Sequence, residues 1–215
     1  MFSRPGLKTQ MSLEWIQEKF TNHSGAFEIQ LEGGEPMIHP DFDKILQFFN
    51  GHPNCSQIII TTNATRLATT PEGIAKWLKQ TQKPFLIKPS INSHLLAHDA
   101  QLLDKCQLLL RAASQTSNIT VRFNVRRLKD QTTNDEAWIL DKLNEYGLTA
   151  DSNIWYFQRY GFGANSPEYD PPFIVANPLD FHLLAPDGQD FGQDLIARSQ
   201  HMLKLFEQDT ASHSK

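Results

Sequence analysis

Residues 27–42 read FEIQLEGGEPMIHPDF, and this stretch sets the organisation of the whole chain. Its first five residues alternate apolar and polar side chains, as in a short strand. A helix predicted to begin at Pro40-Asp41 continues as DFDKILQFF, whose apolar residues recur with helical spacing. The GGEP turn between them is short and polar. A strand that passes through such a turn into a helix is the unit from which parallel sheets are built.

This unit recurs along the chain. Residues 57–61, QIIIT, form a continuous β-branched run that is typical of a strand covered on both faces. We predict strands at 27–31, 57–61, 85–90, 119–125 and 154–158, and helices at 13–20, 41–50, 71–80, 98–113 and 135–146, the last capped by Asn134. The alternation with short links predicts an α/β fold, a partial (β/α) barrel of about five parallel strands with outer helices.

The pattern changes after residue 170. Pro171-Pro172 interrupts the alternation, and the turn Pro186-Asp187-Gly188 between apolar residues predicts a hairpin. A helix is predicted to follow at 194–207. We therefore expect residues 1–170 to form the barrel and residues 171–215 to form a C-terminal extension, a hairpin and a helix packed on the same domain.

The composition disfavours several classes of protein. The chain has 215 residues and a formal net charge of −4, so it has no basic excess to attract a nucleic-acid backbone. It has no run of about 18 apolar residues that would span a membrane. Its first residues lack the apolar stretch of a secretory signal. With only two cysteines, we expect a cytoplasmic protein whose thiols are reduced.

The first predicted strand end is the strongest candidate for a site, because ligands of such sheets bind at the carboxyl ends of the strands. There, Gly33 and Gly34 let a ligand approach the backbone closely. Glu35 presents a carboxylate beside them, and Pro36 stiffens the turn. Farther along, Arg127 and Lys129 are interpreted as a solvated rim.

Residues 31–42, LEGGEPMIHPDF, resemble the motif of the radical S-adenosylmethionine (SAM) superfamily, a strand that ends in GGE or GGEP and leads to an HPDF-like helix start. Thr62-Asn63-Ala64 resembles the family's TNG, with Ala64 in place of the glycine. Ser90-Ile91-Asn92 resembles its S-hydrophobic-D/N pattern, and Asn124 resembles the asparagine of its VN-type strand ends. Residues 161–164 resemble its G-x-A loop, so the resemblance covers about residues 12–165.

The resemblance implies a SAM site. Gly33, Gly34 and Glu35, followed by Pro36, would hold the methionyl amino group, for which a carboxylate and backbone acceptors are suited. The other residues implied are Ser90 and Asn92 near the methionyl carboxylate or ribose, Thr62 and Asn63 along the pocket, Asn124 at the fourth strand end, and Arg122 or Arg126 as the partner of the carboxylate. Alternation puts both arginines on one side of the strand, so the sequence does not choose between them.

The chain departs from the family at the cluster. Family members hold a [4Fe–4S] cluster with three cysteines, usually spaced CxxxCxxC. Cys55 precedes its strand and lies about 20 Å from the expected site, and Cys106 falls in an apolar helix stripe, so we interpret both as small buried hydrophobes. We expect no metal ligands in this chain, and we expect the chain to start after the cluster loop and the first strand.

Three explanations stay open for the missing segment. The sequence begins at an internal methionine, the protein is a natural relative without a cluster, or a separate chain supplies the missing part. In each case the strand at 27–31 has a bare edge. We expect that edge to pair with a second copy or a partner chain, to be covered by the N-terminal segment, or to lower solubility.

The function implied is that of a radical SAM-type protein, or the core fragment of one. It would bind SAM and, with a [4Fe–4S] cluster, generate a radical that modifies a peptide or a cofactor precursor. The isolated 215-residue chain would not be catalytic. The alternative is a relative without a cluster that acts as a SAM-binding or peptide-binding partner subunit.

Overall fold

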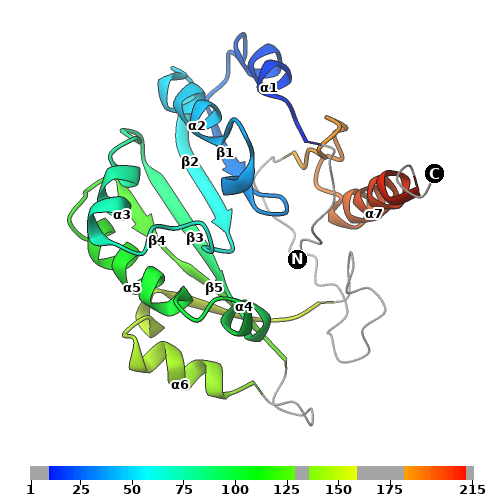
Figure 1. Cartoon of the computed structure of the whole chain (residues 1–215). Coiled ribbons are helices and arrows are strands. Elements are labelled where there is room, and N and C mark those ends of the chain that lie inside the picture. Colours follow the sequence, from blue (N-terminus) through cyan, green and yellow to red (C-terminus); the bar gives the residue numbers. More distant parts are fainter. Residues whose placement is uncertain (1–9, 129–135, 159–181, 212–215) are drawn as a thin grey trace. The chain divides into compact units, whose positions relative to one another are not determined.

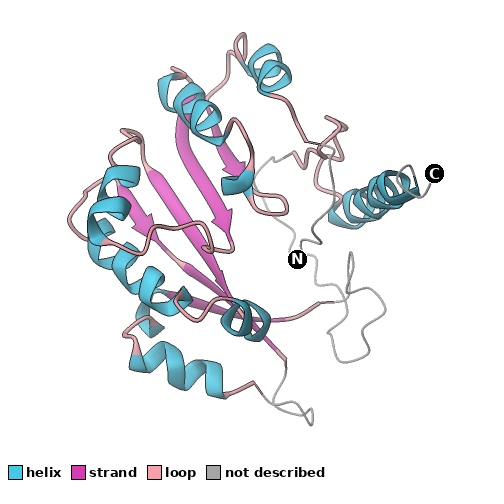
Figure 2. Cartoon of the chain, viewed as in Figure 1, coloured by secondary structure: helices cyan, strands magenta, loops and turns pink. Residues whose placement is uncertain are grey.

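The computed structural model describes residues 10–128, 136–158 and 182–211, which form parts of two compact units. One unit is Thr21–Tyr156. The other combines residues 1–20 with residues 157–215. Figures 1 and 2 show the elements of both units, and each unit is described by itself below.

The larger unit contains a parallel sheet, drawn in magenta in Figure 2. Its strands are β1 (Phe27–Leu31), β2 (Cys55–Thr62), β3 (Phe85–Ile91), β4 (Ile119–Val121), β5 (Phe123–Arg127) and β6 (Ser152–Tyr156). They lie in the order β1-β2-β3-β5-β6, with β4 also paired to β3, and every pairing between these strands is parallel. The predicted α/β fold is therefore confirmed and is consistent with a partial barrel.

The helices of this unit join successive strands. They are η1 (Pro36–Ile38), α2 (Phe42–Gly51), α3 (Pro71–Leu78), α4 (Ser93–His98), α5 (Leu102–Ala113), α6 (Trp138–Glu145) and η2 (Thr149–Asp151). Figure 1 shows α3, α5 and α6 following one another along one side of the sheet. Local sequence fixes several ends: Thr70 caps α3 by accepting a bond from the Gly73 N–H, and Gly147, with φ of 67°, ends α6.

The two faces of the sheet differ in burial because side chains alternate along each strand. One face is apolar and almost fully buried, and is formed by Ile58, Ile60, Phe85, Ile87, Phe123 and Val125. The other face is half-buried and mostly polar, and is formed by Ile59, Thr61, Leu86, Lys88, Ser90, Asn124 and Arg126. A closed (β/α) barrel fills its interior with branched apolar side chains. The polar face here is instead suited to bind a polar ligand.

Three predicted elements differ in the structure. The helix expected at 98–113 begins later, as α5 at Leu102, and residues 93–98 form a separate short helix, α4, that was not predicted. In the link between them the Asp99 carboxylate accepts a bond from the Gln101 N–H. The strand expected at 119–125 is split at Arg122, whose N–H bonds to the carbonyl of Ile87. The last strand also lies two residues earlier than predicted, at Ser152–Tyr156.

Arg127 does not belong to a solvated rim, so that interpretation was wrong. Its position in β5 puts it on the buried face of the sheet, where it is 5% exposed. Its guanidinium lies 5.4 Å from the centre of the Tyr156 ring. Lys129 and the expected helix cap Asn134 lie outside the described residues.

The smaller unit contains α1 (Leu13–Phe20) and α7 (Leu195–Ala211). The predicted hairpin is present in its described part as one antiparallel bridge between Leu184 and Asp190. Its turn requires glycine at position 188, where φ is 86° and a Cβ atom would lie 2.8 Å from the Trp15 ring. Pro171-Pro172 and the G-x-A loop at 161–164 lie outside the described residues. Within the described part of the chain, no helix is long and apolar enough to cross a membrane.

Candidate functional site

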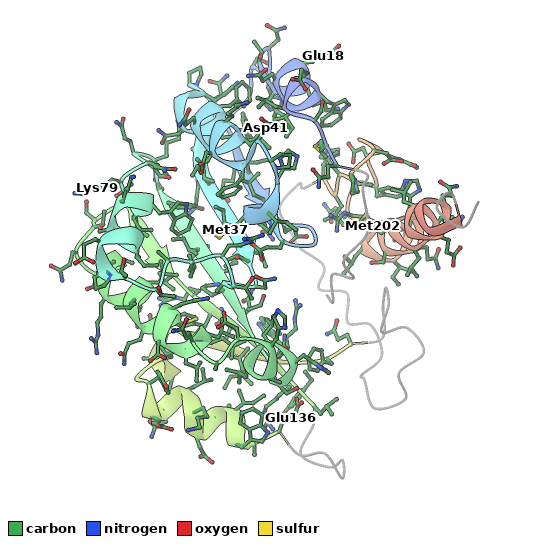
Figure 3. The ribbon with its side chains drawn as sticks, viewed as in Figure 1. Glu18, Met37, Asp41, Lys79, Glu136 and Met202 are labelled. Carbon is green, nitrogen blue, oxygen red and sulfur yellow. The ribbon has the colours of Figure 1, made fainter. Side chains whose placement is uncertain are left out.

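The loops that follow β1 and β2 meet at the carboxyl edge of the sheet. Parallel strands place all their carboxyl ends at one edge, which brings residues far apart in sequence together. Met37, labelled in Figure 3, belongs to the loop after β1. The hydroxyl of Thr62, the last residue of β2, lies 3.5 Å from the Met37 sulfur.

Glu35 joins these two loops. Its Oε1 accepts hydrogen bonds from the Thr62 hydroxyl at 2.7 Å and from the Met37 N–H at 3.1 Å. Its Oε2 accepts a bond from the Asn63 N–H at 2.5 Å. The residue is only 7% exposed, and this burial raises the pKa of Glu35, although its three hydrogen bonds and the charge of Arg66 act in the opposite direction. The carboxylate is thus inside the protein, at the edge where the sequence predicts a site.

The loop after β2 has a specific backbone shape. Ala64 has a φ of 60°, in the left-handed region that normally favours glycine, and is fully buried. This explains why the family resembled here has glycine at that position. The Thr62 hydroxyl, besides its bond to Glu35, accepts a bond from the Ala64 N–H at 3.0 Å, and it is engaged within the protein.

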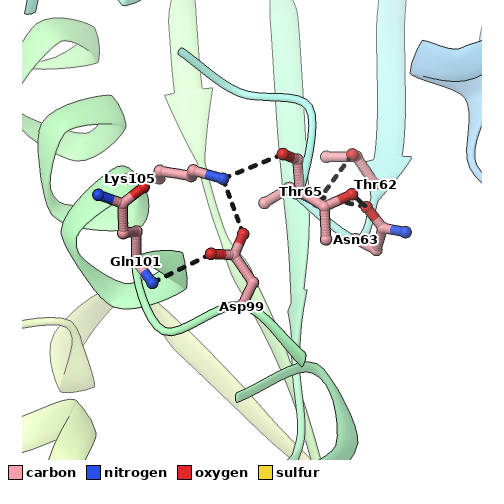
Figure 4. Close-up of polar contacts among 7 residues, drawn as sticks. Thr62, Asn63, Thr65, Asp99, Gln101 and Lys105 are labelled. Atoms are coloured by element: carbon pink, nitrogen blue, oxygen red, sulfur yellow. Dashed lines mark hydrogen bonds and ion pairs between the residues drawn. The ribbon is translucent and has the colours of Figure 1, made fainter. Parts of the chain in front are cut away.

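The Asn63 side chain has a defined orientation. Its Oδ1 accepts bonds from the Thr65 N–H at 3.0 Å and from the Thr65 hydroxyl at 2.7 Å. Because the oxygen is held by two donors, the amide nitrogen is directed away from Thr65, as Figure 4 shows. The structure records no hydrogen bond from this half-buried NH₂ group to a described residue. It is available to donate to a ligand oxygen.

The backbone next to Glu35 is open at Gly33. A Cβ atom built there would have no atom of a described residue within 4 Å, and Gly33 does not have a positive φ. Neither backbone conformation nor packing therefore explains the glycine at position 33. Pro36 begins the short helix η1 and needs no hydrogen bond there.

A row of polar residues continues the site across the sheet. Ser90 pairs in register with Asn124, and Asn124 pairs with Asn153 of β6. Thr62 pairs with Pro89, so that Asn63 follows in line with Ser90. Sequence reasoning missed Asn153, although the alternation of β6 places it on the same face as Asn124.

Three other predicted residues have different surroundings. Arg122 forms an ion pair with Asp151, which occupies its charge. No ion pair of Arg126 with a described residue is recorded, and this side chain lies on the polar face. Asn92 is buried and caps α4 by accepting a bond from the Leu95 N–H at 2.9 Å. Their roles toward a ligand stay predictions.

The two cysteines do not fit a [4Fe–4S] cluster. Cys55 is buried in the first position of β2, at the amino edge of the sheet, and Cys106 is buried in α5. Burial raises the pKa of both thiols, that of Cys106 to about 12, whereas cluster ligands are thiolates. Among the described residues no group of three His, Cys, Asp or Glu side chains is placed to hold a metal ion.

Comparison with known proteins supports a distant relationship. No protein-family model matches the chain. A GTP 3',8-cyclase of Pasteurella multocida (strain Pm70) is 24% identical over 147 residues, which are 65% of this chain and 42% of that protein. The chain thus spans less than half of the length of this relative. The chain is similar to a GTP 3',8-cyclase, and this similarity supports the radical SAM resemblance at the level of the superfamily.

Proposed function

We propose that the Thr21–Tyr156 unit binds SAM at the carboxyl edge of its sheet, as the core of a radical SAM-type protein. The observation that carries this proposal is the pairing of two features in one loop: the open backbone at Gly33 and the buried Glu35 carboxylate two residues later. A glycine at position 33 would let a ligand approach the backbone closely. The buried Glu35 carboxylate would keep this loop rigid through its hydrogen bonds.

Glu35 acts first by holding the loop in place. A carboxylate has roughly four acceptor positions, and three are occupied by Thr62, Asn63 and Met37. The methionyl ammonium would bind backbone acceptors at Gly33 and lie near the negative charge of Glu35. An adjacent ammonium also favours the ionised form of this carboxyl group, which burial alone disfavours.

The methionyl carboxylate would bind on the polar row. Ser90 and Asn124 supply neutral donors, and the Asn63 NH₂ group supplies another. Arg126 is the better candidate for its charged partner, because Arg122 is already paired with Asp151. The ion pair of Arg122 therefore supports Arg126 in the choice between the two arginines that the sequence leaves open.

With a [4Fe–4S] cluster held by residues other than Cys55 and Cys106, and with one electron from a reductant, bound SAM would be the source of a radical. The resemblance implies a substrate such as a peptide or a cofactor precursor. Because Cys55 and Cys106 are buried thiols that do not fit a cluster, we assign no catalytic step to the residues of this chain.

Substituting Gly33 by alanine tests the proposed site. The added methyl group meets no atom of the described residues, so the variant should fold with unchanged stability. The methyl occupies the space that we assign to SAM, and calorimetric titration should show affinity reduced by about tenfold or more. Gly51→Ala is the matched control, since Gly51 also has open space around it but ends α2. Undetectable SAM binding by the wild type, or equal affinity in Gly33→Ala, would refute the proposal.

The second candidate function is a binding subunit without catalysis of its own. The state of the two cysteines favours it, because both thiols are buried and have raised pKa values, whereas cluster ligands are thiolates. An iron and sulfide assay after anaerobic reconstitution separates the two candidates. Stoichiometric iron and sulfide on the chain would exclude the binding-only function, whereas SAM binding without iron would favour it.

A further inference from the structure

We propose that the buried ion pair of Lys105 and Asp99 positions the loop formed by residues 62–65, so that the Asn63 amide faces the ligand. This inference rests on the proposed SAM site and adds two positioning residues to it. Neither residue was among the candidates from the sequence.

Lys105 contacts the loop directly. It lies in α5 and is only 6% exposed, and its Nζ donates to the carbonyl of Thr65 at 3.0 Å. The same Nζ lies 2.7 Å from Oδ2 of Asp99, in the link between α4 and α5. The other oxygen of Asp99 accepts a bond from the Gln101 N–H at 3.0 Å. Figure 4 shows this chain of contacts from the α4–α5 link to the loop after β2.

Two buried charges of opposite sign therefore hold one short loop from two different elements. Glu35, in the loop after β1, accepts bonds from the Thr62 hydroxyl and the Asn63 N–H. Lys105, in α5, donates to the Thr65 carbonyl at the other end of the loop. Between these ends, Ala64 has the left-handed conformation that turns the chain.

The position of Thr65 determines that of the Asn63 side chain. Both the N–H and the hydroxyl of Thr65 donate to Asn63 Oδ1, which directs the NH₂ group away from Thr65. Lys105 holds Thr65 in place by donating to the Thr65 carbonyl. Lys105 therefore affects the Asn63 side chain indirectly, through Thr65. Burying a charged pair costs desolvation free energy, and an apolar pair would stabilise the packing at least as well. The pair is therefore better explained by the geometry that it imposes on this loop.

Burial acts to raise the pKa of Asp99, but the hydrogen bonds from Lys105 and the Gln101 N–H outweigh it and keep this pKa below its ordinary value. Asp99 is thus ionised at neutral pH. Because Asp99 is charged, Lys105 is held by an ion pair as well as by the Thr65 carbonyl.

A purely structural role is the competing explanation, in which Lys105 only attaches α5 to the sheet. The chain offers a matched control for it. The Nζ of Lys83 donates to the carbonyl of Cys55 at 2.6 Å, at the amino end of the same strand β2. Lys83→Met removes a lysine-to-carbonyl hydrogen bond of the same kind, at the amino edge of the sheet, opposite to the proposed site.

The experiment compares SAM affinity in Lys105→Met and Lys83→Met, by calorimetry well below the melting temperature of each variant. We expect Lys105→Met to weaken binding by about tenfold or more, because Thr65 and Asn63 lose their fixed orientation, and Lys83→Met to change it by less than about twofold. Equal affinity in Lys105→Met and the wild type overturns the proposal, and so does an equal loss in both variants.

If Lys105→Met does not fold, Asp99→Asn takes its place. This variant keeps the shape of the pair and the bond from Lys105 to Thr65 but removes the charge. It should weaken SAM binding by about threefold, and unchanged affinity in the folded variant overturns the proposal.

Amide hydrogen exchange distinguishes failure of this inference from failure of the proposed function. It requires no ligand, and it reports on the Thr65 and Ala64 N–H groups that are bonded inside the loop. The exchange of both should be faster in Lys105→Met and unchanged in Lys83→Met. A wild type that does not bind SAM but shows this exchange pattern would refute the SAM site and leave the positioning role intact.

Discussion

Ala64 has the most constrained backbone of the residues in the loop after β2. A left-handed conformation costs a residue with a Cβ atom about 1–2 kcal/mol relative to the right-handed one. Glycine would avoid this cost but would lose a buried methyl group worth about 0.8 kcal/mol. We therefore expect Ala64→Gly to change the free energy of unfolding by less than about 1 kcal/mol.

Valine at the same position should be strongly destabilising. A β-branched side chain is disfavoured at a φ of 60°, and Ala64 is fully buried, so the two added carbon atoms would lie in the packed interior. We expect Ala64→Val to lower the free energy of unfolding by roughly 2–4 kcal/mol, measured by urea denaturation. If the Ala64→Val variant were as stable as the Ala64→Gly variant, the loop would not have this conformation.

At the scale of elements, Glu35 couples the loop after β1 to the end of β2, and this coupling should depend on pH. Burial raises the pKa of Glu35 above its ordinary value of 4.5, so the folded protein holds this proton more tightly than the unfolded chain does. The stability due to this proton is fully present below pH 4.5 and is lost as the pH rises through the pKa of the folded state.

The wild type should therefore lose stability relative to Glu35→Gln as the pH rises above 4.5. Urea unfolding of both proteins at a series of pH values measures this difference. Asp99, Asp187 and Asp190 have lowered pKa values, so their contributions to stability are lost as the pH falls. These contributions are the same in both proteins and cancel in the difference between them. Parallel curves for the two proteins across this range would contradict the buried environment of Glu35.

The strands and the first two loops could be predicted from the sequence, because both depend on local patterns. The β-branched run of β2 indicates a buried strand by itself, and GGEP marks the turn after β1. The short helix α4 and the later start of α5 were not predicted, because the bond from the Gln101 N–H to Asp99 in the link between them cannot be read from apolar spacing.

The contacts that hold the loop after β2 depend on the tertiary structure. Lys105 looks like an exposed lysine in the sequence, and only the packing of α5 brings it to Thr65, 40 residues earlier in the chain. The link from Glu35 to Thr62 and Asn63 spans 27 and 28 residues. Sequence reasoning placed Glu35, Thr62 and Asn63 at the same sheet edge, but it did not predict the hydrogen bonds between the Glu35 carboxylate and the loop after β2.

At the scale of the whole molecule, β1 forms one edge of the described sheet, where its recorded neighbour is β2. Pairing of that edge with another strand, from a second copy or a partner chain, stays a prediction. The site proposed above lies within the Thr21–Tyr156 unit and depends on the carboxyl ends of β1, β2, β3 and β5.

Mapping SAM onto the backbone by NMR tests this account most directly. In ¹⁵N–¹H spectra of the full chain, added SAM should shift the amide signals of Gly33, Asn63 and Ser90, which belong to three different strand ends. The signals of Cys55 and Phe85, at the amino ends of β2 and β3, should stay in place. Shifts confined to those amino ends, or spectra that do not change at millimolar SAM, would contradict a SAM site at the carboxyl edge.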